Sequence, residues 1–319
     1  MPIPSFDFER VHTLATQLRT HSPTKLPSNT ANPRRASVAI IIRARPHQVA
    51  ELALPYTLVE YLKDDRVRAA DFEVLYIRRA ISPTDRWSGQ VAFPGGRREP
   101  GESDQQAAER ETREEIGLDL HTSNYAFLGA LDDRTVHSFM GRTTLLVLCP
   151  FATPPLLPQP TEVASVHWIS FGALLANLPH YHGPTHEVRN HPSSDPVAID
   201  YARRLLPTWL RPCCPLSNRV LHLLSGYYHF HCLTLLVDAL SSHYALPSLE
   251  DSQPLRLWGL TLQMTSDLVD TTFPPDRLPA VPLSGPLPVF EFWDVKAGMY
   301  LWQRWNQWST PRRSGAVIR

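Results

Sequence analysis

The chain has 319 residues, and its 31 lysines and arginines balance 31 aspartates and glutamates. This length allows one large domain or two small ones, and the absence of net charge predicts neither a nucleic-acid nor an acidic-protein partner. Four cysteines without a repeating spacing argue against a disulfide scaffold and fit a reducing compartment. Residues 1–23 lack the unbroken apolar core that is typical of a secretory signal.

Apolar periodicity predicts a series of helices and strands along the chain. A helix is expected over residues 6–18, followed by a polar linker, and another helix over 48–63. Strands are expected over 37–45, 72–80, 88–94, 125–131, 143–149 and 162–170, with helices over 104–116 and 171–178. Strands before and after one well-capped helix indicate a mixed α/β sandwich.

The helix at 104–116 has clear signals at both ends. Ser103 and Gln106 form a capping-box pattern, in which the serine hydroxyl accepts a hydrogen bond from the amide three residues on. Gly117 stands where a left-handed C-terminal cap is expected. The turn before the helix, at 95–101, contains three glycines and a proline. Because glycine has no Cβ, backbone carbonyls in such a turn can approach a metal ion closely.

Three carboxylates on this helix, Glu111, Glu114 and Glu115, are expected to share one face, since residues three or four apart lie together on a helix. Like charges at this spacing repel at a cost of about 0.2–0.5 kcal/mol per pair, which suggests that they serve a cation. Glu111 and Glu115 can jointly hold Mg²⁺, which takes one or two carboxylates and fills its other positions with water and phosphate oxygens. Such a site suits displacement at phosphorus. Arg110 is expected to orient Glu114, and Arg113 to face solvent.

The spacing of these residues resembles the Nudix box. Gly96 is followed by Glu102 and then by RETREEIGL over 110–118 at the intervals of the family. A salt-bridged surface helix is the alternative, but it leaves the glycines and the fixed gaps unexplained. Thr112 departs from the family, which usually has an aliphatic residue there, although its methyl group can still pack. The resemblance implies a Nudix-type α/β/α sandwich with a mixed β-sheet. It also implies hydrolysis, dependent on Mg²⁺ or Mn²⁺, of a nucleoside diphosphate linked to another group.

The resemblance further implies roles for individual residues of the box. By position, Glu111 and Glu115 match the metal ligands, and the carbonyl of Gly96 matches a further ligand. Glu114 matches the residue that helps to activate water. A non-catalytic binding module of the same fold is the alternative, and the complete acidic set makes it the less favoured one.

The stretch ahead of the box, at 75–96, resembles the extended motif of the coenzyme A diphosphatase branch. Arg79 with the small residue after it, and the run over 89–96, match that motif. The spacer departs from it, because Arg86 lies three positions before the second run where the branch tends to have four, and Thr84 occupies the usual arginine position. The alternative is that the end of this stretch is a common start of any Nudix box.

Four arginines around the glycine turn are candidates to meet substrate phosphates: Arg79, Arg86, Arg97 and Arg98. Ordinary surface charge is the alternative for each of them. The resemblance favours coenzyme A or an acyl derivative as the small-molecule substrate, and the alternatives are other nucleotide-type substrates such as ADP-ribose or NADH.

These patterns predict a division of the chain into five parts. Residues 1–35 form a helix and linker, 36–182 the Nudix-type domain with its box at 96–118, 183–254 a proline-rich insertion, 255–272 the closing helix of the domain, and 273–319 a C-terminal extension. The assignment of the closing helix rests on the stretch 257–270, which resembles the same branch. Proline, with 31 residues concentrated after residue 151, predicts irregular connections in the second half.

Four further features have a structural alternative that we favour. Glu162, at the start of a strand, resembles an acidic position outside the box, but a surface carboxylate is favoured. The histidines and cysteines of 180–232 lack zinc-ligand spacing, so no zinc is expected. Residues 219–240 have membrane-like length but contain an arginine, histidines and a glycine, so a buried insertion is favoured over a span. The tryptophan-rich tail at 292–308 could lie on a membrane surface, although packing on the domain is favoured. The oligomeric state stays open.

One pattern concerns localisation. RVHTLATQL over 10–18 fits the N-terminal peroxisomal targeting pattern, with a basic–aliphatic start and a Gln-Leu end on one helical face. An amphipathic helix that packs locally is an equal alternative. We expect a peroxisomal protein, with the cytoplasm or the mitochondrion as alternatives.

Overall fold

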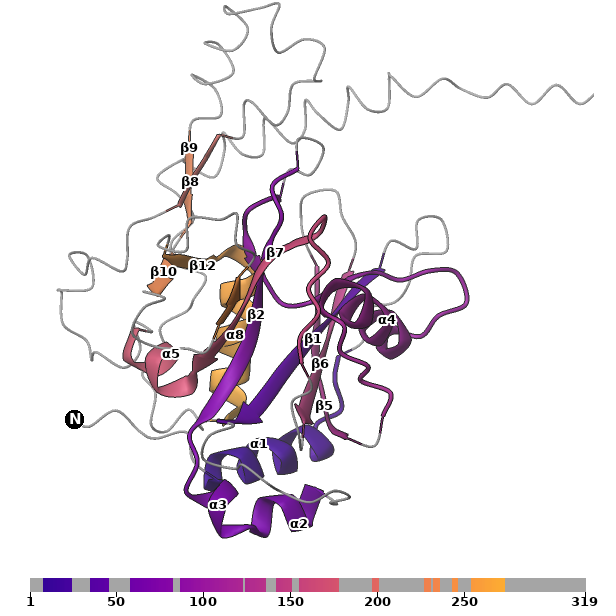
Figure 1. Cartoon of the computed structure of the whole chain (residues 1–319), viewed down its shortest axis with the longest axis vertical. Helices are drawn as coiled ribbons and strands as arrows, with labels where there is room; N and C mark the ends of the chain where they lie inside the picture. The colour runs from indigo at the N-terminus through magenta and orange to yellow at the C-terminus, as the bar shows by residue number, and fades with distance from the viewer. Residues whose placement is uncertain are drawn as a thin grey trace, which may run out of the picture. The chain divides into compact units, whose positions relative to one another are not determined.

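The computed structural model of the chain describes twelve segments, which Figure 1 draws in colour. They are residues 8–24, 35–45, 58–82, 87–122, 124–135, 142–150, 155–177, 197–200, 227–230, 232–235, 243–245 and 254–272. The chain divides into two compact units, Met1–Asp195 with Cys232–Val281, and Pro196–His231 with Pro282–Arg319.

The larger unit is built on one mixed sheet (Figure 1). Its strands are β1 (Arg35–Ala44), β2 (Phe72–Arg79), β3 (Val91–Ala92), β4 (Gly95–Arg97), β5 (Tyr125–Thr135), β6 (Arg142–Pro150), β7 (Val163–Ser170) and β11 (His243–Ala245). The order is β11-β7-β2-β1-β6-β5, and β3 and β4 pair with β2 and β1 respectively. Only the β1–β6 pair among these described strands is parallel, so the predicted mixed sheet is confirmed.

Helices pack on both faces of this sheet. They are α1 (Phe8–Thr20), α2 (Leu58–Lys63), α3 (Asp65–Arg68), α4 (Asp104–Ile116), α5 (Phe171–Asn177) and α8 (Gly259–Thr272). Successive residues of a strand face opposite sides. In β1, Ile40 and Ile42 join one apolar core with α1, α5 and α8, whereas Ala39 and Ile41 join a second core with α4. The sheet is therefore the middle layer of the predicted α/β/α sandwich.

Two predicted elements differ from the structure. The strand expected over 88–94 is replaced by β3 and β4, because the chain crosses from the partner β2 to the partner β1 and turns at Gly95, which has a φ of 142°. The closing helix expected over 255–272 is helical only from Gly259, where φ is 56°. Before it, β12 (Leu255–Trp258) buries alternate residues and pairs with β10 (Cys232–Leu235), and this twofold alternation is typical of a strand.

The segment predicted as an insertion contributes to both units. β10 and β11 belong to the larger unit, where Leu233 and Leu235 are buried. In the smaller unit, β8 (Val197–Asp200) pairs antiparallel with β9 (Tyr227–Phe230). No helix among the described residues combines the length and apolar character needed to cross a bilayer. The tail at 292–308, with its predicted packing, lies outside the described residues, as does most of 180–232.

The N-terminal helix α1 is part of the main core. Val11, Leu14, Ala15 and Leu18 are all buried on its apolar face. This face lies against β5 and α8, and a side chain at Gly129 of β5 would collide with Leu18. The local packing predicted as one alternative for this helix is observed, and peroxisomal targeting stays a prediction.

Candidate active site

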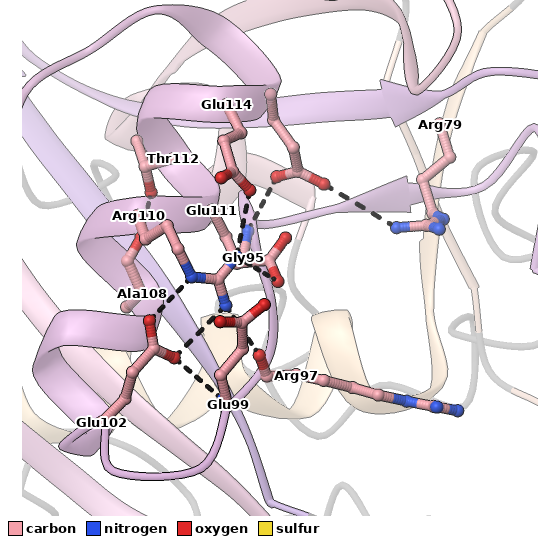
Figure 2. Close-up of polar contacts among 11 residues, drawn as sticks. Arg79, Gly95, Arg97, Glu99, Glu102, Ala108, Arg110, Glu111, Thr112 and Glu114 are labelled. Carbon is pink, nitrogen blue, oxygen red and sulfur yellow. Dashed lines mark hydrogen bonds and ion pairs between the residues drawn. The ribbon is translucent and has the colours of Figure 1, made fainter.

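The helix α4 forms over the predicted residues because its ends are fixed locally. The Ser103 hydroxyl accepts from the Gln106 amide at 3.1 Å, and the Gln106 side chain accepts from the Ser103 amide at 2.8 Å. At the other end, Gly117 adopts a φ of 75° and donates to the Arg113 carbonyl. Thr112, the departure from the family pattern, is buried and donates to the Ala108 carbonyl at 2.7 Å, so it leaves the helix intact (Figure 2).

The end of α4 is also fastened to the segment that leads into β7. The amide of Leu157 donates to the carbonyl of Ile116, and the amide of Gln159 donates to the carbonyl of Glu115, both at 2.8 Å. These two bonds satisfy carbonyls that a helix end leaves open. They hold the C-terminal turn of α4, which carries the acidic residues, beside the start of β7.

Glu115 is buried against the glycine turn. Its side chain is 4% exposed, and its Oε2 accepts a 2.8 Å hydrogen bond from the amide of Gly95. The Arg79 guanidinium lies 3.9 Å from the other carboxylate oxygen (Figure 2). Burial raises the pKa of Glu115 to about 8, because desolvation outweighs the Gly95 hydrogen bond and the Arg79 charge. A buried carboxylate with this little compensation is suited to a cation.

Glu111, one turn earlier, faces the backbone of Gly96. A Cβ added to Gly96 would collide with the carboxyl group of Glu111, so only glycine lets the turn come this close. The turn is held there by β1, in which Ser37 pairs with Gly96. Burial raises the pKa of Glu111 as well. Two carboxylates and a close backbone segment thus converge at one place.

Arg110 holds the acidic residues in order. Its guanidinium donates to Glu102 at 2.7 Å, to Glu111 at 3.1 Å and to Glu114 at 3.0 Å. It also donates to the carbonyl of Arg97 at 2.9 Å (Figure 2). The prediction that Arg110 orients Glu114 is confirmed. Glu114 keeps 58% of its side chain exposed, so water can reach its carboxylate.

The sequence is similar to one family model and to one protein of known sequence. A family model described as the NUDIX domain matches residues 64–188. An uncharacterized protein of Schizosaccharomyces pombe is 33% identical over 277 residues, which cover 83% of this chain and 74% of the yeast protein. The chain belongs to the Nudix family.

Solved structures of Nudix proteins are also similar to parts of the chain. RenU, a Nudix hydrolase of M. smegmatis, is 18% identical, covers 43% of this chain over 70% of its own, and has a TM-score of 0.30. An Ap4A hydrolase of C. elegans is 16% identical, covers 42% of this chain over 78% of its own, and also has a TM-score of 0.30.

Residues 96–118, predicted as the Nudix box, lie within the matched residues 64–188, and the family assigns the chain to hydrolysis of a diphosphate-containing substrate. No three Asp, Glu, His or Cys side chains in the described segments form a metal cluster by themselves. The box instead offers the carboxylates of Glu111 and Glu115 beside the backbone of Gly96. This all-oxygen set fits Mg²⁺ or Mn²⁺, since Mg²⁺ takes few carboxylates and fills its shell with water and phosphate.

Of the arginines predicted to meet phosphates, Arg79 contacts the acidic pair of the Nudix box, with its guanidinium 3.9 Å from Glu115. Arg97 is exposed, and its side chain extends away from the Arg110 cluster (Figure 2). Arg86 lies outside the described residues. Binding of phosphate by these three residues stays a prediction.

Arg98 has a different role in the Nudix fold. Its guanidinium lies 3.3 Å from the carboxylate of Asp104, the first residue of α4. Its backbone amide donates to the carbonyl of Arg35 in β1. Arg98 therefore holds the loop before the helix.

Glu162 is nearer to the Nudix box than the sequence indicated. It is exposed at the start of β7, as expected for a strand-end carboxylate. Burial is the largest cause of the raised pKa of both Glu111 and Glu115, and the negative charge of Glu162 raises both pKa values further. The reason is the neighbouring position of β2 and β7, in which the Glu162 carbonyl accepts from the amide of Ala80 at 2.8 Å. The family resemblance had singled out Glu162, but its closeness to the two carboxylates follows from this strand pairing.

Two tryptophans that the sequence did not single out lie against each other, and one of them is in the turn that follows β2. The turn at Trp87 closes on β2, since Gly89 donates to the Arg79 carbonyl at 3.1 Å. Trp87 and Trp258, both half-buried, have ring centroids 6.3 Å apart. Trp87 therefore belongs to the turn that is hydrogen-bonded to the Arg79 end of β2.

Proposed function

We propose that the protein is a Mg²⁺- or Mn²⁺-dependent diphosphatase that cleaves coenzyme A or acyl-coenzyme A to 3′,5′-ADP and 4′-phosphopantetheine or its acyl form. The observation that carries the hydrolytic part is the convergence of Glu111 and Glu115 on the glycine turn of the Nudix box. The substrate is the finer part of the proposal, and it rests on the sequence resemblance.

We assign metal binding, proton acceptance and phosphate binding to different residues of the site. Glu111, Glu115 and the carbonyl of Gly96 would hold the metal ion, which when bound neutralises phosphate charge and lowers the pKa of water. Glu114 would accept the proton of the attacking water, because Arg110 fixes its carboxylate in an exposed position. Arg79, beside this set, would pair with a phosphate oxygen through its planar guanidinium.

Coenzyme A is favoured by the stretch ahead of the box. Arg79 and the run over 89–96 resemble the motif of the coenzyme A diphosphatase branch. The neighbouring Trp87 and Trp258 would offer apolar surface to the organic part of such a substrate. A Nudix diphosphatase for ADP-ribose or NADH is the second candidate, because the spacer around Arg86 departs from the branch motif.

The compartment belongs to the same proposal. A peroxisomal site of action is motivated by the pattern over 10–18. Burial of Leu18 in the main core means that a targeting receptor would have to read α1 before it docks, or displace it.

The deciding experiment is a substrate comparison. Purified protein is incubated with Mg²⁺ and either coenzyme A, ADP-ribose or NADH at equal concentrations, and the products are separated. We expect 3′,5′-ADP and 4′-phosphopantetheine to form with the highest kcat/KM. Preferred turnover of ADP-ribose or NADH would replace the substrate, and no turnover of any diphosphate would favour a binding module.

A further inference from the structure

Arg35, the first residue of β1, makes a buried ion cluster next to the box. Its guanidinium donates to both oxygens of Asp104, at 2.9 and 2.8 Å, and to the carboxylate of Asp133 at 2.8 Å. The side chain of Arg35 is 5% exposed, and that of Asp133 is fully buried. One guanidinium therefore joins β1, the start of α4 and β5.

The same cluster closes the loop between β4 and α4. The carbonyl of Arg35 accepts from the amide of Arg98 at 2.9 Å, just after β4. The guanidinium of Arg98 contacts Asp104, just after the loop ends. Both ends of the loop are thus fixed to Arg35, one through its backbone and the other through its side chain.

Arg35 is linked to both partners of the contact between Gly96 and Glu111. Two residues after Arg35, Ser37 pairs with Gly96 and sets the position of the turn. Seven residues after Asp104, about two helical turns, α4 carries Glu111, whose carboxyl group lies against Gly96. A shift of the α4 start relative to β1 would therefore open or close the Gly96–Glu111 contact.

We infer that Arg35 is a positioning residue for the metal-binding carboxylates of the box, acting through Asp104 and Asp133. The inference rests on the metal site of the proposed function, and it assigns the spacing between the glycine turn and α4 to a charge cluster centred on Arg35, a residue outside the box. A guanidinium suits this task because it binds two carboxylates at once in a fixed plane, which an ammonium group cannot do.

The chain offers a matched control on the same strand. Arg43, near the other end of β1, is 6% exposed and pairs with Glu73 at 3.0 Å. Arg43 lies eight positions after Arg35, which corresponds to about 26 Å at about 3.3 Å per residue. Arg43 resembles Arg35 in burial and pairing, but it lies at the end of β1 away from Gly96 and α4.

The test compares Arg35→Lys with Arg43→Lys by direct Mn²⁺ binding, followed by electron paramagnetic resonance without substrate. Both variants keep the buried positive charge and lose the planar guanidinium, which donates several hydrogen bonds at once. We expect Arg35→Lys to weaken Mn²⁺ binding about tenfold or more, as changes to residues that hold metal ligands do. Arg43→Lys should bind Mn²⁺ within about twofold of the wild type, which corresponds to about 0.4 kcal/mol. We expect this result even if the Tm of Arg43→Lys falls as much as the Tm of Arg35→Lys.

A second variant protects the test against misfolding. Asp104→Asn leaves the Arg35–Asp133 pair in place and removes only the charge at the start of α4, so it should also weaken Mn²⁺ binding. Wild-type affinity in Arg35→Lys, or in Asp104→Asn if Arg35→Lys does not fold, would overturn the inference and leave the proposed function standing. Equal weakening in Arg43→Lys would also overturn it. A wild-type protein that binds no Mn²⁺ would overturn the metal site and the inference together.

Discussion

The amide of Gly95 donates a 2.8 Å hydrogen bond to the carboxylate of Glu115. This bond joins the first glycine of the turn to the last acidic residue of α4. One residue on, Gly96 lies directly against the carboxyl group of Glu111. The turn and the helix are therefore two halves of one site, and a change in either half should act on the same metal-binding step.

Glu115→Gln should abolish Mg²⁺-dependent turnover and leave the fold intact. The variant removes one of two ligand charges but keeps an oxygen that can accept from Gly95. Its kcat/KM with Mg²⁺ is compared with that of the wild type, and circular dichroism checks the fold. Wild-type rates at saturating Mg²⁺ would exclude Glu115 from the metal site.

The same variant should gain stability in the absence of metal, and the gain should depend on pH. Burial raises the pKa of Glu115 from 4.5 to about 8. Between these values the folded protein holds a proton that the unfolded chain has released, so the free energy of unfolding of the wild type falls as pH rises. The substituted glutamine does not titrate, so the metal-free variant should melt about 2 °C or more above the wild type at pH 8. The gap should close toward pH 4, and a gap that is constant with pH would contradict this cause.

Gly96→Ala should disrupt the site by steric collision alone. The added methyl group would collide with the carboxyl group of Glu111 and push the turn from α4. A displacement of about 1 Å at a reacting centre can cost a hundredfold in rate, so we expect a loss of about that size in kcat/KM. Gly172→Ala is the control, because its nearest neighbour is 4.0 Å from the added carbon. Similar losses in both variants would exclude the steric explanation.

Arg110→Lys should slow catalysis by loosening Glu114. A lysine keeps the positive charge, but it cannot donate to Glu102, Glu111 and Glu114 together. We expect kcat to fall about tenfold to a hundredfold, within the contribution of a positioned general base. Arg113→Lys, at an exposed position of the same helix, should keep the wild-type kcat. An unchanged kcat in Arg110→Lys would mean that Glu114 is not the base.

The parts of the site that depend on local signals could be predicted from the sequence. The bounds of α4 follow from the capping box at Ser103 and from the left-handed glycine at 117, each of which acts within one turn. The mutual placement of Arg110 and Glu114 follows from helical spacing. These interactions join residues at most a few positions apart, so the sequence pattern already contains their geometry.

The parts that depend on strand pairing could not be predicted in this way. β3 and β4 separate because they pair with different strands, and Leu255–Trp258 is a strand because it meets β10. Arg35 contacts carboxylates 69 and 98 positions away in the chain. Such contacts leave no periodic pattern in the sequence, since tertiary packing decides them.

Residues 1–20 provide the test of localisation. Fused to a fluorescent reporter, they should send it to peroxisomes, because the pattern over 10–18 places its basic and apolar positions on one helical face. Changing Arg10 and Leu18 together should disperse the signal. A diffuse reporter with the intact segment would contradict targeting and leave packing of α1 on β5 and α8 as the role of this helix.

The bond that is cut tests the proposed substrate most sharply. If coenzyme A binds with its diphosphate over Glu111 and Glu115, water attacks one phosphorus of the diphosphate. The products are then 3′,5′-ADP and 4′-phosphopantetheine, and a thioester in an acyl substrate stays intact.

The 3′-phosphate distinguishes coenzyme A from ADP-ribose, so we compare coenzyme A with its 3′-dephospho form. If an arginine such as Arg97 binds this phosphate, one charge-assisted contact of about 1.5–3 kcal/mol lowers kcat/KM about tenfold to a hundredfold when the phosphate is removed. Arg97→Ala should remove most of that difference, because the contact is then absent from both reactions. Equal kcat/KM for the two forms in the wild type, with better turnover of ADP-ribose, would assign the site to the second candidate.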